Sequence, residues 1–262
     1  MGNKSDAAAI YHRDGHVAVI TYNRPDALNA IDSSMRRALD EAWVTFREDE
    51  EAWVAIVTGA GRAFSAGADL KSPEGSTGSW PGSFWEWPTI TTFESGMEIW
   101  KPTIAAVNGP CIGYGLTTVL ACDFVLASER ATFAFPEVTL GVPTIVGALR
   151  LPGKLSWADA MELLLTGETI DAERAREINL AWRVVPHGEL LDEAHRLADR
   201  LCAGAPLAVR ATKEMAARGR TLPWTDAVRM GETMSRLVGA SEDAAEGRRA
   251  RLEQRRPEWR AR

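Results

Sequence analysis

Two glycine-rich segments of the chain are suited to presenting backbone amides to a ligand. They are Thr58–Leu70 (TGAGRAFSAGADL) and Lys101–Asp123 (KPTIAAVNGPCIGYGLTTVLACD), and each contains the end of an apolar run. Small residues let a ligand approach the backbone closely, and amides near a helix N-terminus can face an anion. Taken alone, the first segment is equally typical of an ordinary turn. Together, two such turns could offer two N–H donors to one oxygen, the arrangement that stabilises an oxyanion.

A glutamate lies in a third segment, Phe133–Leu151 (FAFPEVTLGVPTIVGALRL). Glu137 follows Pro136 among apolar neighbours, so we expect partial desolvation and a raised pKa. Such a carboxyl group suits a general base or acid. The alternative is a carboxylate at a helix start that accepts backbone N–H groups.

The elements that must position these segments form an α/β pattern in the first half of the chain. Short runs rich in Val, Ile and aromatic residues predict strands at Val17–Tyr22, Val54–Thr58, Thr103–Val107, Phe124–Ala127 and Thr132–Phe135. Asp32 is a candidate N-cap for a helix whose apolar face carries Met35, Leu39, Trp43 and Phe46. We also expect a helix to start after Asp69. Strands that alternate with helices indicate crossover connections between strands.

From about Ser156 the pattern becomes mostly helical. One expected helix carries an apolar stripe formed by Leu190, Ala194, Leu197 and Leu201. Further helices are expected after Pro206, Pro223 and Ser241. One short apolar run, Val184–Val185, interrupts this part.

Composition excludes several classes of function. The chain has 262 residues, of which 45% are hydrophobic and 25% charged, as is ordinary for a globular protein. Its net charge of −6 argues against a nucleic-acid surface, which would be basic. No run approaches a membrane span in length, and nucleotide-binding glycine patterns are not matched. The three cysteines are too scattered for a zinc site or a disulfide framework. We therefore expect a cytosolic protein without a metal site.

The segment Ser72–Trp87 combines loop residues with three tryptophans, Trp80, Trp85 and Trp87. It could form a lid or a pocket wall, or it could be a loop whose tryptophans simply pack on the body or on another subunit. Beyond it, Glu94 and Glu98 could reach a pocket from such a lid, or could lie on a solvated helix face.

In this order and spacing, the three segments resemble the enoyl-CoA hydratase/isomerase (crotonase) family. The similarity covers nearly the whole chain and includes NRPDALNAID (23–32), APLAVRATKE (205–214) and SEDAAEGRRARLEQRRPEW (241–259). It implies an α/β fold in which ββα repeats form a spiral over residues 1–200. It also implies a helical C-terminal trimerisation region over residues 201–262, and therefore a homotrimer or a pair of trimers.

The resemblance also implies roles for individual residues. The amides of Ala68 and Tyr114 would be the two oxyanion donors, since Tyr114 occupies the middle of the family's three-glycine stretch and only its N–H is needed. Coenzyme A would be bound by residues on two segments: Ala27, Leu28, Ala66, Asp69 and Leu70. CoA is part of the thioester substrate, and no other cofactor is implied.

One departure from the family pattern concerns the reaction. Hydratases of the family use two glutamates; Glu137 aligns with the second, whereas Thr117 stands at the position of the first. Thr117 cannot act as a carboxylate base, although it could hydrogen-bond a water. Single-glutamate double-bond isomerisation, or hydration, of an enoyl-CoA is the expected reaction. A non-catalytic acyl-CoA binding protein, and a hydrolase or decarboxylase on the same scaffold, remain alternatives.

Overall fold

The structure, a computed structural model, describes residues 7–72 and 92–262. In this part of the chain the larger sheet has six strands in the order β1-β2-β3-β4-β6-β9. They are β1 (Ala9–Asp14), β2 (Val17–Tyr22), β3 (Val54–Gly59), β4 (Thr103–Val107), β6 (Phe124–Ser128) and β9 (Arg183–Val185). The β1–β2 pair is an antiparallel hairpin, and every other pair is parallel. Parallel neighbours require crossovers, so the α/β expectation is confirmed.

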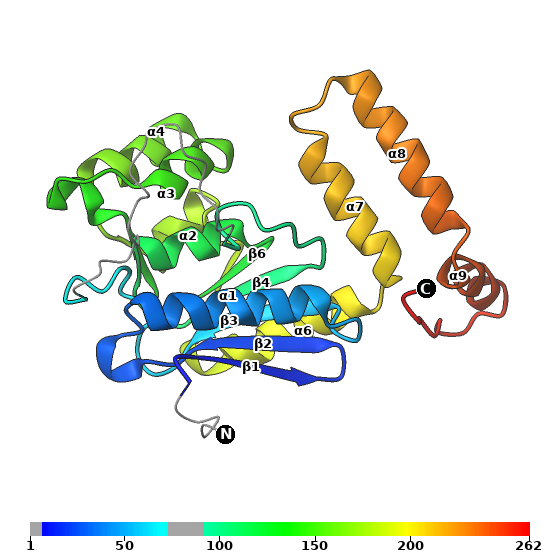
Figure 1. The fold of residues 1–262 in the computed structure, drawn as a ribbon, viewed down its shortest axis with the longest axis horizontal. Helices are drawn as coiled ribbons and strands as arrows, with labels where there is room; N and C mark the ends of the chain where they lie inside the picture. Colours follow the sequence, from blue (N-terminus) through cyan, green and yellow to red (C-terminus); the bar gives the residue numbers. More distant parts are fainter. Residues whose placement is uncertain (1–6, 73–91) are drawn as a thin grey trace.

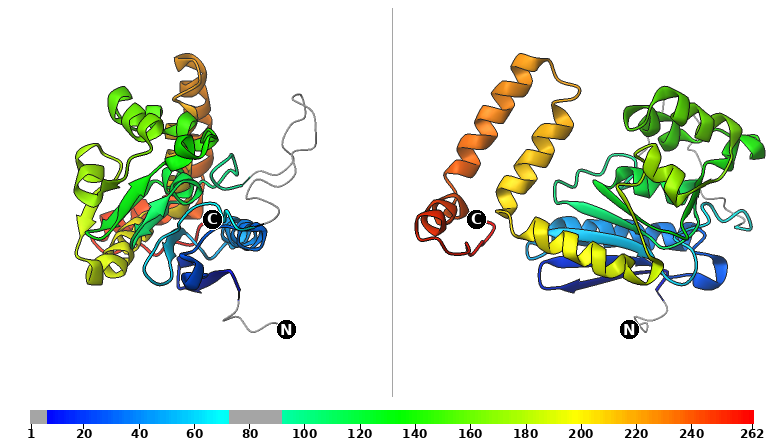
Figure 2. Two further views of the ribbon diagram at one scale, coloured as in Figure 1. Left: turned by 90° about the vertical axis from the view of Figure 1, so that its left-hand side faces the viewer. Right: turned by 180° about the vertical axis from the view of Figure 1, so that it is seen from behind.

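Helices cover both faces of this sheet (Figures 1 and 2). Helix α1 (Ser33–Glu48) packs on one face, and its buried residues are the predicted stripe together with Ala42. Helix α6 (Leu190–Cys202) packs on the other face, against β3, β4 and β6. Every residue of β3 is buried, because Ala55 and Val57 face the α1 side while Val54 and Ile56 face the α6 side.

A second, smaller sheet carries the turns on which the site is built. In the described residues it contains β5 (Cys111–Ile112), β7 (Thr132–Ala134) and β8 (Ile170–Asp171). Strands β5 and β7 are parallel, with Ile112 paired to Ala134. Strand β5 leads into α2 (Tyr114–Ala121), and β7 leads into the 3-10 helix η2 (Pro136–Leu140) and then α3 (Ile145–Arg150). Parallel strands bring their following turns to the same edge of a sheet.

The remainder of the chain is mainly helical. It contains α4 (Trp157–Met161), α5 (Ala172–Glu177), α7 (Pro206–Arg218), α8 (Trp224–Gly239), α9 (Glu242–Leu252) and the short turns η1 (Pro25–Ala27), η3 (Leu151–Gly153), η4 (Glu162–Thr166) and η5 (His187–Glu189). The α7–α8 hairpin extends away from the sheets (Figure 1). In the described part of the chain no helix is both long and apolar enough to cross a bilayer.

The C-terminal tail folds back onto the body and anchors α9. The Trp259 indole N–H donates to the Ala203 carbonyl at 2.9 Å, and its ring packs on Gly247. Asp243 of α9 accepts two tail amides, at 2.7 and 2.9 Å. These contacts link α9 and the tail to the C-terminal end of α6.

All five predicted strands are present, with ends that differ by at most one residue. Asp32 caps α1 by accepting the Met35 amide at 2.8 Å, as predicted. Residues 70–71 form a turn, and the helix expected after Asp69 would fall mainly on residues 73–91, outside the described residues. The segment Ser72–Trp87 lies outside them too, except for its first residue. Strand β1 was not predicted, because its outer half is polar and exposed.

Candidate active site

The turn after β5 and the turn after β7 meet at Gly113 and Glu137. The Gly113 amide donates to the Ala134 carbonyl at 2.9 Å, which continues the pairing of the two strands. Gly113 has φ 52° and ψ −119°, a conformation that favours glycine. A Cβ on Gly113 would lie only 2.9 Å from Oε1 of Glu137. The carboxylate therefore lies against the backbone of the residue that precedes Tyr114.

The segment containing Ala68 lies on the other side of β5. The Ile112 amide donates to the Ser65 carbonyl at 2.9 Å. At Gly67, where φ is 86°, an added Cβ would be 3.5 Å from the Tyr114 nitrogen. Neither the Ala68 amide nor the Tyr114 amide donates to an acceptor within the described residues. Two N–H groups on adjacent segments are thus available to a ligand oxygen.

Burial raises the pKa of Glu137, partly offset by a hydrogen bond from its own backbone amide. Its Oε2 atom is buried and has no hydrogen-bond partner among the described residues. The helix-start alternative therefore holds only in part, because the carboxylate interacts with its own amide while Oε2 is left without a donor among the described residues. A partly desolvated carboxylate with a raised pKa is a better proton acceptor than a solvated one and can return the proton afterwards.

Thr117 lies one turn into α2 and is buried. Its hydroxyl donates to the Tyr114 carbonyl at 2.7 Å, a bond within the first turn of the helix. The proton of this hydroxyl is therefore engaged, while its lone pairs can still accept a hydrogen bond.

The residues expected to bind CoA lie on two loops that contact each other: Ala27 and Leu28 on one, and Ala66, Asp69 and Leu70 on the other. The Ala66 amide donates to the Leu28 carbonyl at 2.9 Å, with Leu28 in the left-handed region at φ 51°. Asp69 pairs with Arg24 at 3.3 Å, and Leu70 is 76% exposed. The two loops are thus held together by a hydrogen bond and an ion pair, and the side chain of Leu70 is exposed to solvent.

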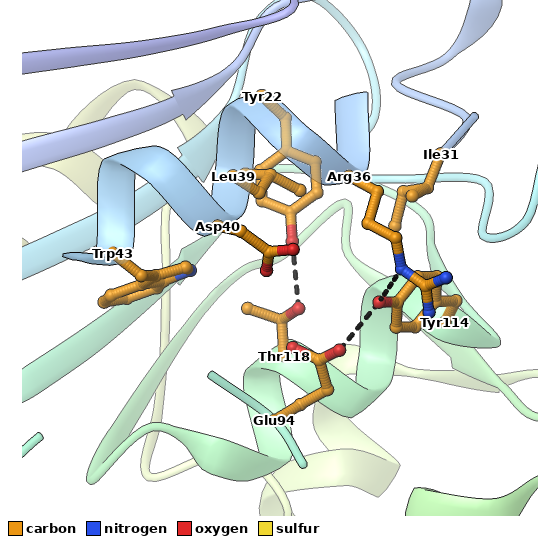
Figure 3. A pocket seen from close by; sticks show the side chains of 9 residues that line it. All are labelled: Tyr22, Ile31, Arg36, Leu39, Asp40, Trp43, Glu94, Tyr114 and Thr118. Carbon is orange, nitrogen blue, oxygen red and sulfur yellow. Dashed lines mark hydrogen bonds between the residues drawn. The ribbon is translucent and has the colours of Figure 1, made fainter. Parts of the chain in front are cut away.

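The side chain of Tyr114 enters a small polar pocket that the sequence did not reveal (Figure 3). Its hydroxyl donates to Oε1 of Glu94 at 2.7 Å and accepts from Nε of Arg36 at 3.3 Å. The pocket is lined by Tyr22, Ile31, Arg36, Leu39, Asp40, Trp43, Glu94, Tyr114 and Thr118. Tyr114 thus presents its amide at the turn and its phenol to α1.

Of the two glutamates that could reach a pocket or lie on a solvated face, Glu94 lines a pocket. Glu98 instead pairs with Arg218 at 2.8 Å, with more than half of its side chain exposed. Arg36 and Asp40 were missed because they lie on α1, far from Tyr114 in sequence. The available signal was their spacing of four residues beside the apolar stripe of that helix.

Comparison with known proteins agrees with this geometry. The family model described as enoyl-CoA hydratase/isomerase matches residues 12–262. The chain belongs to this family. Its structure is accordingly of the crotonase type, and it is similar to solved enoyl-CoA hydratase structures along almost its entire length. One, from Mycobacterium tuberculosis H37Rv, has a TM-score of 0.88 and 34% identity, covering 98% of this chain and 100% of that chain.

Two relatives illustrate the relationship. The chain is 41% identical to a carnitinyl-CoA dehydratase of Salmonella agona, over 95% of this chain and 97% of that protein. It is 36% identical to an (E)-benzylidenesuccinyl-CoA hydratase of Thauera aromatica, over 94% of this chain and 96% of that protein. The chain is thus an enzyme of a family that acts on CoA thioesters.

Proposed function

We propose that the Ala68 and Tyr114 amides bind the oxygen of a CoA thioester and that Glu137 moves a proton at the carbon beside it. The observation that carries this proposal is the contact of the Glu137 carboxylate with Gly113, immediately before the Tyr114 amide. A thioester bound at this turn would then have a proton acceptor, Glu137, and an oxyanion donor, the Tyr114 amide, close to the same carbon and oxygen atoms. Removing a proton there produces an enolate, whose negative charge falls on the oxygen that the two amides bind.

The amides contribute because they are already oriented by β5 and by the turn at Gly67. Each such donor is worth about 3–4 kcal/mol of transition-state stabilisation in comparable sites. The reaction requires no metal and no redox cofactor, since the charge is held by N–H groups and the proton by a carboxylate. Coenzyme A enters as part of the substrate, and we propose that the paired loops at Leu28 and Ala66 bind it.

We propose reversible hydration of an enoyl-CoA as the overall reaction. Water would add to the third carbon of the acyl chain while giving a proton to Glu137, and Glu137 would then return that proton to the enolate carbon. In the reverse direction the same carboxyl group would take that proton and protonate the departing hydroxyl group. The names of the two relatives, a hydratase and a dehydratase, support this choice.

Double-bond isomerisation is a second candidate, favoured by Thr117. This residue supplies no carboxylate, and its hydroxyl proton is bound to the Tyr114 carbonyl. With a 3-enoyl-CoA, Glu137 would remove a proton beside the thioester and return it two carbons further along. This route needs one carboxylate and no water.

Product analysis distinguishes these reactions. The protein is mixed with crotonyl-CoA and separately with a 3-enoyl-CoA, and products are identified by mass and retention. A product heavier by one water supports hydration, whereas conversion of the 3-enoyl to the 2-enoyl ester without change of mass supports isomerisation. Glu137→Gln should abolish either reaction while Glu98→Gln, a surface control, should not. Binding of both esters without reaction would overturn the proposal in favour of a binding role.

We also propose that the protein assembles as a trimer or a pair of trimers in the cytoplasm. Exposed apolar side chains along α8 support the assembly. None of the residues of this helix is buried, and Trp224 and Leu237 are 82% and 71% exposed. Contact with another copy would remove this surface from water.

A further inference from the structure

We propose that Glu94 is a positioning residue that holds Tyr114, and with it the second oxyanion amide, in register with Glu137. The inference rests on the proposed function, because it concerns the same amide. The family resemblance implies glycine at position 114, so the tether depends on a side chain that departs from the family pattern.

The first observation is the arrangement of donors around the Glu94 carboxylate (Figure 3). Glu94 is only 7% exposed. Its Oε1 accepts from the Tyr114 hydroxyl at 2.7 Å and from Oγ1 of Thr92 at 2.6 Å. Arg36 donates to the same tyrosine oxygen, and its guanidinium lies 5.4 Å from the ring centroid. The phenol is therefore fixed from two elements, and burial favours such charge-assisted bonds.

The second observation is that the backbone of Glu94 is tied to the element that follows Glu137. Arg150, the last residue of α3, donates from Nε and Nη2 to the Glu94 carbonyl at 3.1 and 2.7 Å. Helix α3 comes directly after the turn that ends η2. Glu94 thus contacts Tyr114 through its side chain and the Glu137 segment through its carbonyl.

The third observation is that α2 begins without a side-chain cap. Gly113 is the N-cap residue, and it has no side chain to accept the first amides of the helix. Tyr114 is the first residue of α2, so its side chain is the anchor nearest to the turn. Loss of this anchor would let the helix start, and its free amide, move relative to Glu137. Even a small displacement of an oxyanion donor matters, because the rate of the reaction depends strongly on how the reacting groups are aligned.

The experiment compares three variants and a matched control. Tyr114→Phe removes the hydroxyl but keeps the ring and the amide, and Glu94→Ala removes the acceptor. Glu94→Gln keeps an oxygen that can accept both hydroxyl groups. Thr118→Val is the control, because it removes the pocket's hydrogen bond between the hydroxyl groups of Thr118 and Tyr22 at 2.9 Å, which involves neither Tyr114 nor Glu94.

The direct readout is the carbonyl stretching band of bound butyryl-CoA labelled with ¹³C at the thioester. Hydrogen bonding to the proposed oxyanion donors should lower this frequency in the wild-type protein. We expect Tyr114→Phe and Glu94→Ala to lose part of the shift and to lower kcat on crotonyl-CoA about tenfold, with KM changed less than about threefold. Glu94→Gln and Thr118→Val should retain the wild-type band, although Thr118→Val should unfold at a lower temperature.

The outcomes separate the two proposals. A wild-type band shift that persists unchanged in both Tyr114→Phe and Glu94→Ala would overturn the positioning role of Glu94 and leave the proposed oxyanion site intact. A bound butyryl-CoA whose carbonyl band equals that of the free ester in the wild-type protein would overturn the proposed function itself. Equal loss of the shift in Thr118→Val would show that general disturbance of the pocket is responsible, and would overturn the specific role.

Discussion

Adding one methyl group at Gly113 tests the contact between the oxyanion turn and the proton-carrying glutamate. In Gly113→Ala the new Cβ would lie 2.9 Å from Oε1 and 3.5 Å from Cδ of Glu137. Ordinary contacts of a Cβ begin at 3.4 Å, so the carboxylate has to retreat by about 0.5 Å. The atom that must move is the end of the Glu137 side chain, so this movement should misalign the carboxylate with the bound thioester.

The expected loss follows from that displacement. A misplacement of about 1 Å can cost about 100-fold in rate, so we expect about tenfold in kcat, or about 1.4 kcal/mol in the barrier. The backbone conformation at Gly113 adds a separate cost of about 1–3 kcal/mol in folding stability. The assay measures turnover and thioester affinity at a temperature at which the variant is fully folded.

Gly15→Ala is the matched control, because Gly15 has φ 54° and no atom within 4 Å of an added Cβ. It should lose stability and keep its turnover. Full activity in Gly113→Ala, or an equal loss of activity in Gly15→Ala, would refute the assigned contact.

Three further predictions concern stability and assembly. Burial, together with the charge of Glu94, raises the pKa of Asp40 from 3.8 to about 6. Between these two values the unfolded chain releases the Asp40 proton more readily than the folded protein, so the unfolding free energy falls as the pH rises from 3.8 to about 6. Asp40→Asn should remove that loss. The full pKa shift is worth about 3 kcal/mol, and solvent screening of this half-buried group reduces it to about 1–2 kcal/mol. Urea unfolding should therefore show the variant to be more stable than the wild type by about 1–2 kcal/mol at about pH 8 and by almost nothing at about pH 3. Trp259→Ala should lower the unfolding free energy by about 2 kcal/mol by releasing the tail, and an unchanged denaturation midpoint would contradict the anchoring. Leu237→Glu should reduce the mass measured by light scattering below that of a trimer, and an unchanged mass would show that this face of α8 is not in the interface.

Much of the fold could be predicted because burial leaves a periodic pattern in the sequence. The stripe Met35, Leu39, Trp43 and Phe46 and the cap at Asp32 define α1. The runs in β3 and β4 are almost entirely apolar and every residue is buried, because helices cover both faces of the sheet. Strand β5 has only two residues, held by pairing with β7 and with the segment around Ser65, so no local pattern identifies it.

The two backbone turns of the candidate site could be predicted from their glycines. Positions 67 and 113 are glycine because only a residue without Cβ fits beside the Ile112 carbonyl and the Glu137 carboxylate, respectively. The network behind Tyr114 was not predictable. It joins Arg36 to a residue 78 positions away, and a charged residue on a helix gives no sign of a partner so distant. Only the replacement of glycine by tyrosine pointed to a special role there.

Proton exchange beside the thioester tests the central claim most directly. Butyryl-CoA is saturated, so it can neither add water nor shift a double bond, and deuterium uptake from D₂O reports enolate formation alone. We expect the wild-type protein to exchange this proton, and Glu137→Gln to bind the ester equally well but exchange at least about 100-fold more slowly. Exchange at the wild-type rate in Glu137→Gln, or tight binding without exchange in the wild-type protein, would contradict the assignment of Glu137.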